Sequence, residues 1–129
     1  MKRIIPVLVA LFLVFAGAGV AASASTDDPT TGDTITYAFY SDTSVNVSVV
    51  YFDADGELQT IENAKLSKYD STEGWYYGTV TFTSRSTYQP VAASIQTNGK
   101  FAACSTRVNG ESSGLVTATG RYTVASCPE

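Results

Sequence analysis

The feature that most constrains the fold is a set of short segments in which apolar and polar residues alternate. Between Thr34 and Tyr40, for example, Ile35, Tyr37 and Phe39 occupy every second position. This period of two places the apolar side chains on one face of a β-strand, whereas a helix needs a period near 3.6. Six further segments share this pattern or the β-branched and aromatic composition that favours strands: residues 45–52, 57–61, 75–83, 91–97, 101–108 and 121–127.

Turn-forming residues separate these segments and predict how they connect. Residues 53–57 (DADGE) predict a hairpin turn, and Asn98-Gly99 predicts a second, two-residue hairpin turn between its neighbouring strands. The polar residues 62–74 predict a connection that crosses between sheets, and residues 109–114 predict a loop. About seven short strands without a convincing helix predict an all-β domain, an immunoglobulin-like antiparallel β-sandwich.

The start of the chain predicts that the remainder is exported. Two basic residues precede an apolar run over residues 4–22, which ends on small residues that resemble a signal-peptidase site. The run is also long enough for a bilayer-spanning helix, so residues 1–24 are either a cleaved signal peptide or an uncleaved membrane anchor. Both alternatives place the rest outside the cytoplasm, secreted or anchored to the plasma membrane and facing the periplasm or cell wall. Residues 25–33 predict a flexible linker, and residues 34–129 the β-sandwich domain.

The charge of the exported part argues against a nucleic-acid partner. Beyond Lys2 and Arg3 the chain carries six basic and twelve acidic side chains, a net charge of −6. Phosphate binding relies on clustered Lys and Arg, and the basic residues here are dispersed among carboxylates. The charge therefore predicts an acidic surface that keeps an exported domain soluble.

The chain has two cysteines, Cys104 and Cys127, which fall in the last two predicted strands. An exported domain meets an oxidising compartment, so we expect a structural disulfide that fastens the C-terminal strand to its neighbour. Reduced or intermolecular thiols are the alternative. A structural zinc site normally needs four Cys or His ligands, and a redox pair is normally a CxxC motif, so neither fits. We expect no metal and no cofactor.

The sequence contains no visible catalytic constellation. Because it has no histidine, Ser-His-Asp and Cys-His arrangements are excluded, and we expect a non-enzymatic protein. Asp53, Asp55 and Glu57 alternate along the predicted hairpin turn, where two carboxylates on one side would suit Ca²⁺ or acid and base chemistry. Turn chemistry favours the alternative, a solvated hairpin tip. Asn46 begins an NVS glycosylation acceptor, which matters only in a eukaryotic secretory host.

Residues 74–78 (GWYYG) form the most concentrated aromatic stretch. Trp75, Tyr76 and Tyr77 alternate across a strand, so at least one ring points away from the core. Exposed rings beside glycines suit a sugar or a lipid chain, which makes these three the candidate ligand-binding or partner-binding residues. The alternative is that one face packs in the core and the other covers a sheet edge.

Three segments together resemble the MmpS family, small membrane-associated accessory proteins that accompany MmpL transporters in mycobacteria and their relatives. They are residues 49–66 (VVYFDADGELQTIENAKL), 102–111 (AACSTRVNGE) and 125–127 (ASC). In that family a strand ending in Tyr runs into an acidic, glycine-containing turn, a cysteine strand leads into a short turn with Gly, and a second cysteine closes the domain. Members usually have a definite anchor and a Pro-Trp pair after the second hairpin strand, where this chain has residues 66–75 (LSKYDSTEGW).

The resemblance implies a cell-envelope β-sandwich that assists an MmpL-type transporter of the RND class in exporting lipids, glycolipids or siderophores. Its expected partners are the transporter or its lipid cargo, with membrane association through residues 1–24 if these are uncleaved. The departures from the family pattern leave a different class of function open. That alternative is a free secreted β-sandwich module that binds carbohydrate or lipid.

Overall fold

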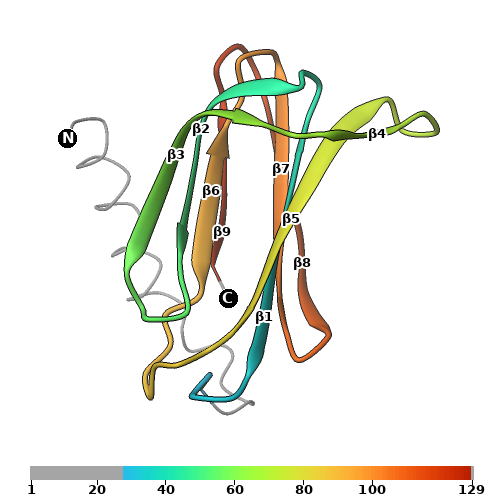
Figure 1. Ribbon diagram of the computed structural model, residues 1–129. Coiled ribbons are helices and arrows are strands. Elements are labelled where there is room, and N and C mark those ends of the chain that lie inside the picture. Colours follow the sequence, from blue (N-terminus) through green and yellow to red (C-terminus); the bar gives the residue numbers. More distant parts are fainter. Residues whose placement is uncertain (1–27, 129) are drawn as a thin grey trace.

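The computed structural model describes residues 28–128, which form two antiparallel sheets packed face to face (Figure 1). The nine strands are β1 (Thr34–Ser41), β2 (Val45–Phe52), β3 (Leu58–Lys65), β4 (Lys68–Asp70), β5 (Trp75–Thr83), β6 (Ala92–Gln96), β7 (Phe101–Val108), β8 (Glu111–Thr119) and β9 (Val124–Pro128). Sheet A has the order β4-β5-β1-β7-β8, and sheet B has the order β3-β2-β6-β9. The predicted all-β antiparallel sandwich is confirmed, with nine strands among the described residues where about seven were expected.

The start of the chain lies largely outside this description. The predicted signal peptide or anchor, residues 1–24, falls outside the described residues. Within residues 28–128, no helix is long and apolar enough to cross a membrane. Part of the predicted linker is described, and it lies along the loop after β5: the N–H of Gly32 donates to the carbonyl of Ser84 (2.9 Å), and the N–H of Ser84 donates to the carbonyl of Asp33 (2.8 Å).

Two predicted connections match the structure. The acidic turn joins β2 and β3 as a hairpin, with Phe52 opposite Leu58 at its base. The connection predicted over residues 62–74 does cross between sheets, since β3 belongs to sheet B and β4 to sheet A. Most of that connection is nevertheless strand, because β3 extends to Lys65 and β4 then forms a hairpin with β5. The period-two signal missed β4 because it is only three residues long.

The hairpin predicted at Asn98-Gly99 is wrong, because β6 lies in sheet B and β7 in sheet A. The chain changes sheets here, and the carboxylate of Asp42 stabilises the crossover by accepting the N–H groups of Lys100 (3.0 Å) and Phe101 (3.2 Å). A Cβ added to Gly99 would lie 2.8 Å from Oδ2 of Asp42, so glycine is needed for this approach. An Asn-Gly pair is compatible with a hairpin turn and with this crossover, so the local sequence does not distinguish the two.

The loop predicted over residues 109–114 is correct only at its start. Asn109 and Gly110 form the β7–β8 turn, both with positive φ (53° and 88°), and β8 begins immediately afterwards. The pairing of β7 with β8 shifts register between Ser105 and Arg107. The first half of β8 is rich in serine and glycine, which carry little strand signal, so the sequence does not reveal this strand.

The core lies between the two sheets and contains the alternating residues of β1. Ile35, Tyr37 and Phe39 are each at most 2% exposed, as the period of two predicted. Cys104 and Cys127 are buried among them and form the predicted disulfide, with a Cα–Cα distance of 5.9 Å.

The disulfide does not have the expected role of fastening the C-terminal strand to its neighbour. β9 pairs with β6, so the bond does not fasten the C-terminal strand to a neighbour in its own sheet. It joins β7 of sheet A to β9 of sheet B across the core, and β8 lies between the two in sequence. The disulfide is therefore an inter-sheet bridge.

Candidate functional site: an aromatic cluster on sheet A

The three aromatic residues at the start of β5 divide between the two faces of sheet A. Tyr76 packs against the core and contacts Tyr69 of β4, with ring centroids 4.8 Å apart. Trp75 and Tyr77 alternate with it and therefore lie on the opposite face, turned away from sheet B. We call this the outer face of sheet A.

Two rings from other strands join Trp75 and Tyr77 there. Tyr40 of β1 lies opposite Tyr77 in the strand register, with centroids 6.2 Å apart, and its ring meets Trp75 edge-on at 5.9 Å. Phe101 of β7 stacks on Trp75 at 4.5 Å with an angle of 22° between the rings. All four side chains are half-buried. We call Tyr40, Trp75, Tyr77 and Phe101 the outer aromatic cluster.

Small and hydroxyl-bearing residues continue the outer face beyond these rings. Ala38 lies between Thr79 and Ser105, and in the row after that the hydroxyls of Thr36 and Thr81 are 3.1 Å apart. The outer-face positions of β1, β5 and β7 contain no leucine, isoleucine, valine or methionine. Rings fixed by mutual packing beside hydroxyl groups offer both stacking and hydrogen bonds to a ligand.

The sequence reasoning identified only half of this cluster. Trp75 and Tyr77 were among the predicted site residues and lie in it, whereas Tyr76 does not. Tyr40 and Phe101 were missed because they belong to β1 and β7, two strands that are distant from β5 in the sequence. The alternation along each strand shows on which face of that strand Tyr40 or Phe101 lies. Placing them beside Trp75 requires knowing that β1 pairs with both β5 and β7.

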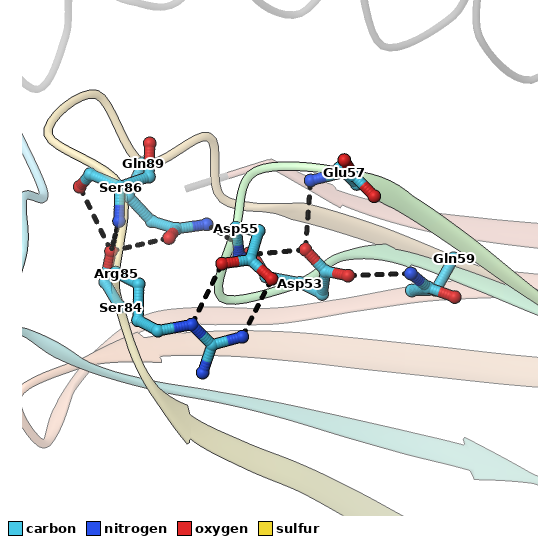
Figure 2. Close-up of polar contacts among 8 residues, drawn as sticks. All are labelled: Asp53, Asp55, Glu57, Gln59, Ser84, Arg85, Ser86 and Gln89. Atoms are coloured by element: carbon cyan, nitrogen blue, oxygen red, sulfur yellow. Dashed lines mark hydrogen bonds and ion pairs between the residues drawn. The ribbon is translucent and has the colours of Figure 1, made fainter.

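In the acidic turn, the second candidate site, the carboxylates of Asp53 and Asp55 bind neighbouring backbone and side-chain groups of the protein (Figure 2). Asp53 accepts the N–H groups of Asp55 (2.9 Å) and Glu57 (3.0 Å), and its other oxygen accepts the side-chain amide of Gln59 (2.6 Å). Asp55 forms a two-pronged ion pair with Arg85, at 2.9 Å from Nε and 2.8 Å from a terminal nitrogen. Within residues 28–128, no group of three acidic or cysteine side chains is arranged to hold a metal ion.

The electrostatics of the turn agree with this structural role. Partial burial alone would raise the pKa of Asp53, but hydrogen bonds from Glu57, Gln59 and Asp55 outweigh it and lower the pKa. The hydrogen bond from Arg85 lowers the pKa of Asp55. Both carboxyls therefore stay ionised at neutral pH, where a general acid or base needs a pKa near the working pH.

The loop after β5 completes this polar network from the other side, as Figure 2 shows. Gln89 is 4% exposed, and its amide donates to the carbonyl of Asp53 (2.9 Å) while its oxygen accepts the hydroxyl of Ser84 (2.6 Å). The β2–β3 turn is thereby attached to sheet A through a loop rather than through strand pairing. The arrangement matches the hairpin tip that turn chemistry favoured, with the addition of a fixed partner.

The glycosylation acceptor is not available in the folded domain. Asn46 is 1% exposed, and its side-chain amide donates to the carbonyl of Thr43 (3.2 Å). A glycan on this side chain would have no room without unfolding the start of β2.

No protein-family model matches the chain, and no curated protein sequence matches it. The buried Cys104–Cys127 disulfide fits an oxidising, extracytoplasmic compartment. The roles inferred from the MmpS resemblance and from the aromatic residues are therefore proposals.

Proposed function

We propose that this protein is a non-enzymatic accessory protein of the cell envelope, similar to MmpS, that assists an MmpL-type transporter in exporting lipids or siderophores. The observation that carries the proposal is the way in which the three resembling segments come together in the fold. Residues 49–66 contain the second half of β2, the acidic turn and β3. Residues 102–111 contain most of β7 and the turn after it, and Cys104 within them is bonded to Cys127 of the third segment.

This assembly supports the proposal because each segment alone is short. The resemblance therefore rests on the three segments taken together. Here the two cysteine segments are linked covalently across the core, and residues 49–66 supply β3 and half of β2 at one edge of sheet B, the sheet that also contains Cys127. An acidic, disulfide-closed sandwich is also suited to a position outside the cytoplasm.

The transport proposal is tested by deleting the gene in its host and measuring the lipids and siderophores that leave the cell. We expect one exported class to fall and to return when the wild-type gene is restored. In parallel, the tagged full chain is recovered from envelope extracts in mild detergent, with an unrelated exported β-domain carrying the same leader as the control bait. A large RND-type transporter should accompany the protein and not the control. Unchanged export together with no transporter on intact, oxidised bait would count against the proposal.

A second candidate function has its own support in the outer aromatic cluster. Four rings from β1, β5 and β7 gather on one face and remain half-buried, with hydroxyl-bearing residues beyond them. The function in this case is that of a free secreted module that binds carbohydrate or lipid. It shares the location and the lack of catalysis with the first proposal, and differs in needing no transporter.

The fluorescence of Trp75 tests the second function directly, because it is the only tryptophan of the chain and lies in the cluster. We expect envelope glycolipids or oligosaccharides to shift its emission with a saturable dependence on concentration. Tyr40→Ala should weaken that binding, whereas Tyr88→Ala, which removes an 83% exposed ring on the loop after β5, should leave it unchanged. An unchanged spectrum with every ligand tested would remove the support for this function.

A further inference from the structure

The two sheets end in four edge strands among the described residues, and three of these edges are protected against pairing with another chain. β4 has only three residues, two of them charged. β3 carries Glu62 and Lys65 and is interrupted at Asn63, whose φ is 54°. β9 has five residues and ends at Pro128, which has no N–H to donate. Short length, charge, irregular backbone and proline are the usual means by which edges avoid association.

β8, the other edge of sheet A, has few of these protections. It is nine residues long, and its only charged residue is Glu111 at the start. An irregularity at Gly114, where φ is 106°, disturbs the first half of the strand. From Leu115 to Thr119 the strand pairs regularly with β7 and contains neither charge nor proline. Every second residue of this stretch directs its backbone N–H and C=O away from β7.

The side chains of this stretch are also incompletely covered. Val116 lies opposite Cys104 and so belongs to the core-facing side of β8, yet it is 39% exposed. Leu115, on the outer face, is 49% exposed. A further strand next to β8 in sheet A would help to cover Val116, but β8 is the last strand of that sheet.

We propose that β8 is a self-association edge, at which a second copy of this chain adds its own β8 in antiparallel orientation. A two-fold axis at Thr117 would place this residue opposite Thr117 of the second copy. Val116 would then face Ala118 of the other copy, and Leu115 would face Thr119. No charged side chains are opposed in this register, and the opposed Thr117 hydroxyls form the kind of threonine pair that is favourable across strands.

The register explains why a second copy is the occupant that this edge fits. Glu111 lies outside the paired stretch, so two acidic chains can meet here without opposing their charges, although each carries an excess of acidic residues overall. The contact joins the two copies of sheet A into one continuous sheet across the axis. Because only five residues of each strand pair, the interface is small, and we expect a weak dimer that forms between micromolar and millimolar concentrations.

Sedimentation of the full chain as recovered from its host, over that concentration range, tests the proposal. We expect reversible dimer formation by the wild-type protein. Thr117→Lys places two like charges against each other at the axis and should weaken dimerisation about tenfold or more. Thr60→Lys is the matched control, because Thr60 is an exposed threonine on the other sheet's edge strand β3. It should dimerise like the wild type.

Cross-linking supplies a second readout that does not depend on affinity alone. Residues opposed across an antiparallel pair have Cα atoms about 4.5 to 5.5 Å apart, which is within disulfide range. Thr117→Cys should therefore give a covalent dimer under mild oxidation, and Thr60→Cys should not. A protein that stays monomeric throughout and gives no Thr117→Cys dimer overturns the proposal. A dimer that Thr117→Lys leaves intact also overturns the proposal, as does a dimer that Thr60→Lys disrupts as strongly as Thr117→Lys.

Discussion

Removal of the disulfide is the most informative perturbation of this fold. The bond links β7 to β9 and thereby sheet A to sheet B, with both cysteines at most 1% exposed. The perturbation is replacement of Cys104, of Cys127, or of both by alanine. Because either single replacement breaks the same bond, the three variants should lose similar amounts of stability.

The magnitude has two sources. The cysteines are 23 residues apart, and opening a loop of that length raises the unfolded-state entropy by an amount equivalent to roughly 3 kcal/mol. Each missing sulfur also leaves a small void in the core, which costs about 1 kcal/mol, similar to removing one buried methylene group. We therefore expect each single variant to lose about 4 kcal/mol and the double variant about 5 kcal/mol. Independent effects would instead add to about 8 kcal/mol.

Urea unfolding followed by Trp75 fluorescence and by circular dichroism measures these losses. The dependence of the unfolding free energy on urea should also steepen, because the unfolded chain without the bond exposes more surface. Amide exchange gives a second measure: an inter-sheet bridge predicts lower protection in both β7 and β9, whereas a bond that only fastened the C-terminal strand would affect β9 alone. A loss below about 1 kcal/mol in the double variant, or strictly additive single losses, would refute this reasoning.

Three other perturbations test separate parts of the structure. Gly99→Ala should cost about 1 to 3 kcal/mol in urea unfolding, because the new Cβ would displace the Asp42 carboxylate from the N–H groups it accepts. Tyr37→Phe should cost about 1 to 2 kcal/mol, because the ring stays while the hydroxyl no longer donates to the carbonyl of Phe52 (2.8 Å); an unchanged urea midpoint would contradict this. The pKa of Asp53 is lower in the folded state, so its contribution is complete above the ordinary carboxyl value near 4 and is lost as pH falls through the folded pKa. Asp53→Asn should therefore flatten the acid-induced fall of the urea midpoint, and an unaltered pH dependence would show that other carboxyls control it.

Local patterns predicted the strands that carry a complete signal. The alternation of Ile35, Tyr37 and Phe39 identified β1 and the face that it buries. The acidic turn identified the β2–β3 hairpin, because turn preferences depend on neighbouring residues alone. Local patterns failed for β4, which is too short to show a period, and for β8, whose first half is serine-rich.

The candidate site was predictable only in part, for the same reason. A strand containing Trp75, Tyr76 and Tyr77 must separate the middle ring from the other two, and the structure places Tyr76 against the core and the others outside. The completion of the cluster by Tyr40 and Phe101 depends on which strands lie beside β5 and β7. Strand pairing is a long-range property of the backbone, and many pairings are compatible with one set of strands.

The sequence by itself determined that this chain would form short antiparallel strands and that one apolar face of β1 would be buried, and it favoured the pairing of the two cysteines. These results come from side-chain periodicity, turn chemistry and the chemistry of thiols. Tertiary structure alone decided which sheet each strand joined, and so made the disulfide a bridge between sheets and the Asn98-Gly99 turn a crossover. The physical reason is that both features depend on contacts between segments that are distant in the sequence. The Asp42 carboxylate binds the N–H groups of the crossover, and the packing of the two sheets brings β7 against β9.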